Sequence, residues 1–119
     1  MSTVTALLPM GNTVLAAATA SASAGVQVAA VNATVSADTF YIVNSSSTLV
    51  AFVAFGATAG AAQSACVIPT GTSQAVIAIP PNTGLSVKGS PTTPTGPFVS
   101  AITTAAGPAN VYVTPIEGI

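Results

Sequence analysis

Side chains that could carry out acid–base or nucleophilic chemistry are scarce in this sequence. Asp38, Lys88 and Glu117 are the only charged residues among 119, and histidine is absent. A mechanism based on paired carboxylates would require Asp38 and Glu117 to meet in the fold. Nucleophilic triads and the usual zinc sites need histidine or several cysteines, and Cys66 is the single cysteine. The sequence therefore predicts a protein that is not an enzyme and has no metal and no cofactor, with Cys66 as a small buried apolar residue.

The low charge also limits the partners that we expect. Charged residues make up 3% of the chain, whereas soluble domains usually carry about a quarter. A single lysine cannot neutralise several phosphates, so neither nucleic acid nor an anionic membrane surface is an expected partner. A domain this neutral tends to associate, and a core of Ala and Val stabilises it weakly. We therefore expect a homo-oligomer, or a protein stabilised by a larger assembly.

The uncharged stretch 48–67, TLVAFVAFGATAGAAQSACV, raises the question of a membrane span. Its length would suffice for a spanning helix, and Gly56 and Gly60 have the GxxxG spacing of helix pairs. However, no Lys or Arg flanks it, and its apolar character falls off after residue 55. Residues 56–64 are Gly, Ala, Thr, Gln and Ser, a composition typical of a loop. We therefore expect a strand followed by a loop, and no membrane span.

The rest of the chain consists of short β-branched runs separated by Pro, Gly and Asn-Ser segments, which is typical of strands. Their spacing predicts an all-β fold, a single antiparallel β-sandwich or jelly-roll-like barrel of about 8 strands. Residues 39–44 and 48–55 flank an Asn-Ser-Ser-Ser turn and are expected to pair as a hairpin. The continuous apolar run 48–55 predicts burial on both faces. The expected strands are 4–8, 13–20, 25–35, 39–44, 48–55, 66–68, 73–79, 85–88, 98–103 and 110–114.

Two segments leave alternatives open. The Ala-rich stretch 16–24 is the one place where a helix competes with a strand. The proline-rich segment 91–97, PTTPTGP, is either a surface loop or an arm that lies on a partner. Residues 14–24 end in an A-x-A pattern, but no Lys or Arg precedes them, so we do not expect a cleaved secretion signal. We expect one domain over residues 1–119, with residues 1–12 as a candidate extended arm.

Three short motifs resemble small proteins encoded near the capsid genes of tailed bacteriophages. The first is the strand AFVAFG with the Ala/Thr loop after it, the second is the turn VIPTG, and the third is the C-terminal NVYVTPIEGI. The resemblance covers residues 40–119 in patches, and Pro115 and Ile116 depart from it where a Gly is expected near the Glu. The matching residues are Phe52, Val53, Phe55, Gly56, Ile68, Pro69, Gly71, Tyr112, Val113, Thr114, Glu117 and Gly118.

The resemblance implies a virion structural protein, specifically a capsid cement or decoration protein on the capsid surface. Such proteins are often trimers that tie neighbouring major capsid protein subunits together at three-fold or quasi-three-fold sites. Alternatives are a head fibre, a tail component, a host-binding virion module, or a small secreted β-protein. An N-terminal arm could add a strand to a partner. The candidate interface residues are Leu7, Leu8, Met10, Phe98 and Val99.

Overall fold

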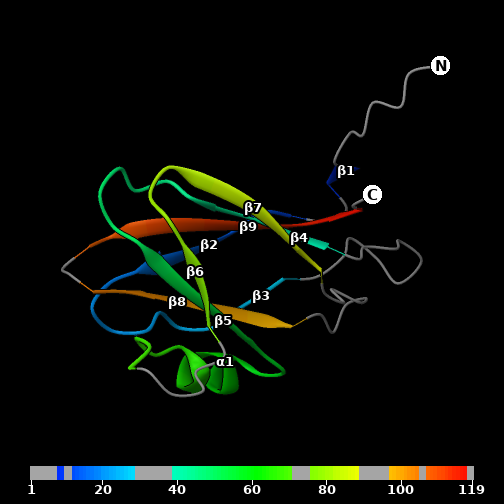
Figure 1. The fold of residues 1–119 in the computed structure, drawn as a ribbon. Coiled ribbons are helices and arrows are strands. Elements are labelled where there is room, and N and C mark those ends of the chain that lie inside the picture. Colours follow the sequence, from blue (N-terminus) through cyan, green and yellow to red (C-terminus); the bar gives the residue numbers. More distant parts are fainter. Residues whose placement is uncertain are drawn as a thin grey trace.

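The computed structural model of the chain describes residues 8–9, 12–28, 39–70, 76–88, 97–104 and 107–117, and for residues 8, 9, 88 and 117 it describes the backbone alone. These residues form two antiparallel sheets that pack face to face, with one short helix below them (Figure 1). The elements in chain order are β1 (Leu8–Pro9), β2 (Val14–Ala18), β3 (Val26–Gln27), β4 (Thr39–Asn44), β5 (Ala51–Gly56), α1 (Ala59–Ala65), β6 (Ile77–Ile79), β7 (Thr83–Lys88), β8 (Phe98–Thr103) and β9 (Ala109–Glu117).

The strand pairing is nested. Each of β2 to β5 pairs with its counterpart from the end of the chain: β2 with β9, β3 with β8, β4 with β7, and β5 with β6. Further pairing of β4 with β9 and of β5 with β8 joins these units into sheet 1, β2-β9-β4-β7, and sheet 2, β3-β8-β5-β6. The short β1 pairs with the C-terminal end of β9 and is the fifth strand of sheet 1. This is the strand order of a jelly roll, a long antiparallel hairpin rolled into two sheets. The prediction of an all-β sandwich is confirmed.

The core lies between the two sheets and is made of small residues, as the composition predicts. In β4, Phe40 and Ile42 are buried, whereas Tyr41 and Val43 are half-buried on the outer face, as the two-residue period of a strand requires. Phe40 stacks on Phe55 of the opposite sheet, with ring centroids 4.6 Å apart. The buried core residues are Ala16, Ala18, Val28, Phe40, Ile42, Ala51, Val53, Ile79, Val99, Ala101, Ala109, Val111 and Val113.

The predicted hairpin of residues 39–44 and 48–55 is wrong, because β4 belongs to sheet 1 and β5 to sheet 2. The connection between β4 and β5 crosses from one sheet to the other. Hydrogen bonds from its own polar side chains stabilise it, in place of the backbone hydrogen bonds that would pair two strands of a hairpin. The Asn44 side chain accepts a hydrogen bond from the Ser46 backbone N–H at 3.0 Å and donates one to the Leu49 carbonyl at 2.8 Å. Such side-chain bonds compete with sheet pairing in Asn- and Ser-rich segments.

The predicted loop at 56–64 is also wrong, because it contains α1. Thr58 caps this helix: its hydroxyl oxygen accepts a hydrogen bond from the Ala61 N–H at 3.0 Å. Four alanines among its seven residues favour the helical state. The helix packs on β5 and β8, so β5 is covered on both faces. This confirms the predicted burial on both faces for residues 51–55, whereas residues 48–50 precede the strand and Thr48 is exposed. α1 is too short to cross a bilayer. Within the described part of the chain, no helix is both long enough and apolar enough to span a membrane.

Several other segments have a structure that differs from the prediction, and some predicted segments lie outside the described residues. Residues 66–68 are not a strand, because the chain there leaves α1 with the Cys66 N–H bonded to the Gln63 carbonyl. The Ala-rich stretch 16–24 contains the end of β2 and no helix. Of the expected strands 4–8, 25–35 and 73–79, the described parts pair only at Leu8, Val26–Gln27 and Ile77–Ile79. Residues 91–96 lie outside the described part.

Candidate functional site

The sheet register brings two of the three charged residues to one end of sheet 1. Thr39, the first residue of β4, is opposite Lys88 on one side and Ile116 on the other, so the backbones of Lys88 and Glu117 flank the same end. Asp38 lies outside the described residues. Within the described part of the chain, no three His, Cys, Asp or Glu side chains gather where they could hold a metal ion.

Cys66 is the C-cap residue of α1 and lies in a second small cluster with Ala54 and Ile102. Its side chain is 2% exposed, and its Sγ donates a hydrogen bond to the Phe52 carbonyl at 3.4 Å. Burial raises the pKa of the Cys66 thiol, against smaller opposing effects of hydrogen bonds with Ser100 and Ala54. The thiol is therefore protonated and enclosed, which confirms the prediction of a small buried apolar residue and is unlike a nucleophilic cysteine.

The predicted interface residues lie in different environments. Leu7 and Met10 lie outside the described residues, and of Leu8 only the backbone is described, paired with Glu117 within the same chain. Phe98 is half-buried at the start of β8. Val99 is fully buried in the core, which leaves its side chain no surface for a partner. Val99 is therefore a core residue and not a contact residue.

Two other residues form an exposed apolar surface on sheet 1. Leu15 and Tyr112 are the exposed large hydrophobic side chains among the described residues, at 45% and 37% exposure. They lie directly opposite each other on β2 and β9. We call this pair the β2–β9 patch. Val43 lies opposite Tyr112 on its other side, so the apolar row continues onto β4.

Uncharged polar groups border the β2–β9 patch. The hydroxyls of Thr13 and Thr114 are hydrogen-bonded at 2.6 Å beside it. The Tyr41 ring lies over Gly84, where a Cβ atom would come within 2.5 Å of the tyrosine oxygen. A side chain at position 84 would therefore push the Tyr41 ring aside, so Gly84 keeps this outer face flat.

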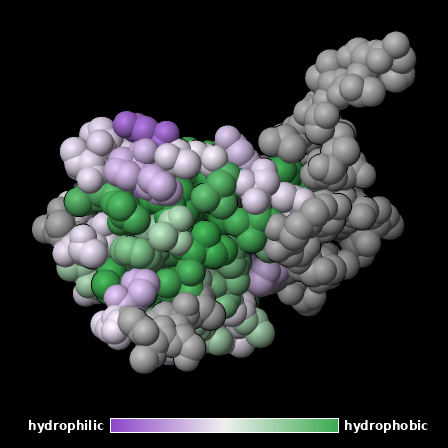
Figure 2. Space-filling model, in the orientation of Figure 1, coloured by the Kyte–Doolittle hydropathy of each residue, from purple (hydrophilic) through white to green (hydrophobic). Residues whose placement is uncertain are grey.

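A second apolar surface lies where β6 and β7 end the two sheets. No described strand pairs with the free side of either strand, so both leave backbone groups open. Ile77 of β6 and Leu85 and Val87 of β7 pack against the core yet stay half-buried at this rim. We call these three residues the β6–β7 edge. Figure 2 shows hydrophobic residues gathered over this side of the molecule.

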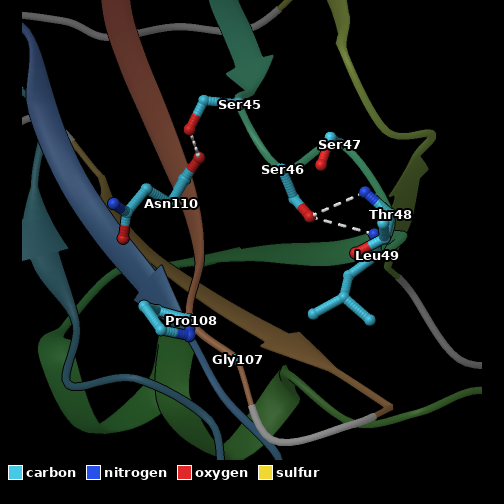
Figure 3. A pocket seen from close by; sticks show the side chains of 8 residues that line it. All are labelled: Ser45, Ser46, Ser47, Thr48, Leu49, Gly107, Pro108 and Asn110. Atoms are coloured by element: carbon cyan, nitrogen blue, oxygen red, sulfur yellow. Dashed lines mark hydrogen bonds between the residues drawn. The ribbon is translucent and has the colours of Figure 1, made fainter.

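A polar cavity of about 450 Å³ lies at one end of the sandwich. Its two walls are the connection from β4 to β5 and the start of β9 (Figure 3). No lining residue is charged. The lining residues are Ser45, Ser46, Ser47, Thr48, Leu49, Gly107, Pro108 and Asn110.

Sequence reasoning missed both the β2–β9 patch and the cavity. The period-two alternation of VLAAA and NVYVT could have indicated that Leu15 and Tyr112 point away from the core, because both lie between residues that turn inward. The cavity has no such signal, because it joins segments about 60 residues apart that meet only through the sheet pairing. Protein-family models, curated proteins and solved structures yield no match to the chain.

Proposed function

We propose that the chain is a virion structural protein, a cement or decoration protein that stabilises a phage head by bridging major capsid protein subunits. The observation that carries this proposal is the presence of two separate uncharged apolar surfaces on one small domain. The β2–β9 patch lies near one edge of sheet 1 and the β6–β7 edge lies at the other, since β2 and β7 are the outermost long strands of this sheet. A protein that bridges two neighbours needs two such surfaces.

The energetics of the fold support a role in an assembly. Among the described residues, the core contains many Ala and Val side chains and one pair of stacked aromatic rings, so it buries little apolar area per residue. Apolar side chains left half-buried at the β6–β7 edge gain further burial when a neighbour covers them. A partner that binds the folded state but not the unfolded state raises the stability of the fold by mass action. The domain is therefore expected to be more stable on the particle than alone.

The topology and the charge agree with this proposal. Jelly rolls occur in viral capsid domains and in lectin domains, and the fold alone does not decide between them. With 3% charged residues, the surface suits contacts with other neutral protein surfaces rather than with nucleic acid. We propose a homotrimer as the bound form, in which three copies present their patches around a three-fold site.

Heads prepared with and without this protein test the proposal. Heads that lack the chain should open at a lower temperature in scanning calorimetry, and the purified wild-type chain should restore the transition. Sedimentation of the purified chain alone should show a trimer or concentration-dependent association towards one. Heads that open at the same temperature with and without the chain would contradict the proposed function.

A further inference from the structure

The polar cavity lies where two connections between the sheets meet. The chain passes from sheet 1 to sheet 2 between β4 and β5, and back from sheet 2 to sheet 1 between β8 and β9. The first of these connections forms one wall of the cavity with Ser46, Ser47 and Thr48. The end of the second forms the other wall with Pro108 and Asn110 (Figure 3).

Hydrogen bonds hold these walls in place without a ligand. The Asn110 carbonyl accepts two bonds from Ser45, one from its backbone N–H at 3.0 Å and one from its hydroxyl at 2.9 Å. The Ser46 hydroxyl oxygen accepts from the N–H groups of Thr48 and Leu49 at 3.2 and 2.9 Å. The Ser46 carbonyl accepts from the Asn82 N–H at 2.8 Å. The cavity is therefore preformed, which reduces the entropy lost when a ligand binds.

Three polar side chains of the lining remain available to a ligand. Within the described structure, the hydroxyls of Ser47 and Thr48 and the carboxamide of Asn110 take part in no hydrogen bond, unlike the side chains of Ser45 and Ser46. Together they offer donors and acceptors to a ligand. In Figure 3 the Asn110 carboxamide points away from the wall that contains Ser47 and Thr48. Leu49 and Pro108 add apolar surface beside them.

The lining defines the chemistry of a ligand. No charged side chain lines the cavity, and Lys88 and Glu117 lie at the opposite ends of β7 and β9, away from Thr83 and Ala109. A phosphate, carboxylate or ammonium group would lose water there without gaining an ion pair. A sugar ring has hydroxyls that donate and accept, and C–H faces that pack on apolar side chains. We propose that this cavity binds one ring of a neutral carbohydrate.

This proposal does not rest on the capsid role, because it depends on the cavity alone. We expect a low affinity, because the cavity is open and water competes for its hydrogen-bonding groups. Dissociation constants for single sugars should lie in the millimolar range. Attachment of several copies to one particle would raise the overall avidity for a glycan surface.

Titration of the ¹⁵N-labelled full chain followed by NMR tests the proposal. The probes are methyl α-glucoside, methyl α-mannoside, methyl β-galactoside and N-acetylglucosamine, with sodium phosphate as the charged comparison. At least one sugar should produce saturable shifts at the Ser47 and Thr48 amides and the Asn110 side-chain amide. Phosphate should produce none. Absence of saturable shifts with all four sugars, or shifts spread over both sheets, would overturn the proposal.

Matched variants separate this site from a general effect of sugar on the protein. Thr48→Val removes one free hydroxyl at similar volume, and Asn110→Ala removes the free carboxamide but keeps the backbone carbonyl that holds the wall. Each should weaken binding by about fivefold, the usual effect of one neutral hydrogen bond. Ser64→Ala, on the exposed side of α1, should leave it unchanged. Equal binding by all three variants would also overturn the proposal.

Discussion

Asn44 and Ile79 connect the two sheets through one hydrogen bond. Nδ2 of Asn44, the last residue of β4, donates to the carbonyl of Ile79, the last residue of β6, at 3.0 Å. The same amide group lies within hydrogen-bond distance of the carbonyls of Leu49, at 2.8 Å, and Pro80, at 3.3 Å. Asn44 is fully buried, so one side chain satisfies carbonyls from two separate connections.

We predict that Asn44→Ala lowers the free energy of unfolding by about 2–4 kcal/mol, because buried carbonyls lose their donor and a cavity opens. The matched control is Asn110→Ala at the same end of the sandwich, where the side chain is half-buried and forms no hydrogen bond in the described structure. The control should change stability by less than about 0.5 kcal/mol. Urea unfolding measures both variants, and equal losses would show that Asn44 does not hold the connections.

Gly56 and Gly60 should respond oppositely to alanine. A Cβ at Gly56 would lie 2.5 Å from the Ala62 backbone nitrogen, so Gly56→Ala must push α1 away from β5. We expect a loss of about 1–3 kcal/mol, as for other overpacked sites. Gly60, within α1, has no atom within 4 Å of its Cβ position, and Gly60→Ala should stabilise the helix by about 0.5–1 kcal/mol. Thermal unfolding distinguishes the two, and a gain from both would contradict the packing described for α1.

The raised pKa of Cys66 predicts a pH dependence. The folded chain holds the thiol proton more tightly than the unfolded chain, because burial disfavours the thiolate. Above the ordinary thiol pKa of about 8.5 the unfolded state therefore loses this proton first, and stability falls as pH rises. Below that pH the effect is absent, since both states are protonated.

Cys66→Ala isolates this effect, because the variant and the wild-type chain differ at this one side chain. The wild-type free energy of unfolding should fall more steeply with pH than that of the variant above about pH 8.5. Chemical denaturation at several pH values measures the two slopes. Parallel slopes would mean that the thiol ionises equally easily in the folded chain.

The β2–β9 patch should matter for assembly and little for folding. Leu15→Ser combined with Tyr112→Ser removes the apolar surface while β2 and β9 stay paired. We expect a change of less than about 1 kcal/mol in stability, and at least a tenfold loss of binding to heads that lack the protein. Ser64→Ala on α1 serves as the control and should bind normally. Full binding by the double variant would remove this patch from the proposed interface.

Local patterns in the sequence predicted most of the fold. The strands over 39–44, 98–103 and 110–114 follow from β-branched runs between turn residues. The double coverage follows from the continuous apolar run at 51–55, whereas Thr48 at the start of the predicted range is exposed. The partner of each strand could not be predicted in the same way. The composition of the Asn-Ser-Ser-Ser segment is that of a hairpin turn. Its actual role depends on the buried Asn44 amide, which donates hydrogen bonds to the carbonyls of Leu49 and Ile79, and these contacts cannot be derived from local sequence.

The candidate surfaces depended on that long-range pairing. Tyr112 and Leu15 are about 100 residues apart in the sequence and meet only because β2 pairs with β9. The helix α1 was missed because its Ala and Gly composition is also that of a loop, and its Thr58 cap is a weak signal by itself. Conversely, the apolar character of Val99 suggested a contact residue, although its position in the middle of sheet 2 makes it part of the core.

Quantitative mass spectrometry of purified particles tests the central claim most directly. The experiment counts this chain against the major capsid protein in particles of the virus that encodes it. The proposed cement role predicts a copy number comparable with that of the major capsid protein. A few copies for each particle, or none, would contradict it.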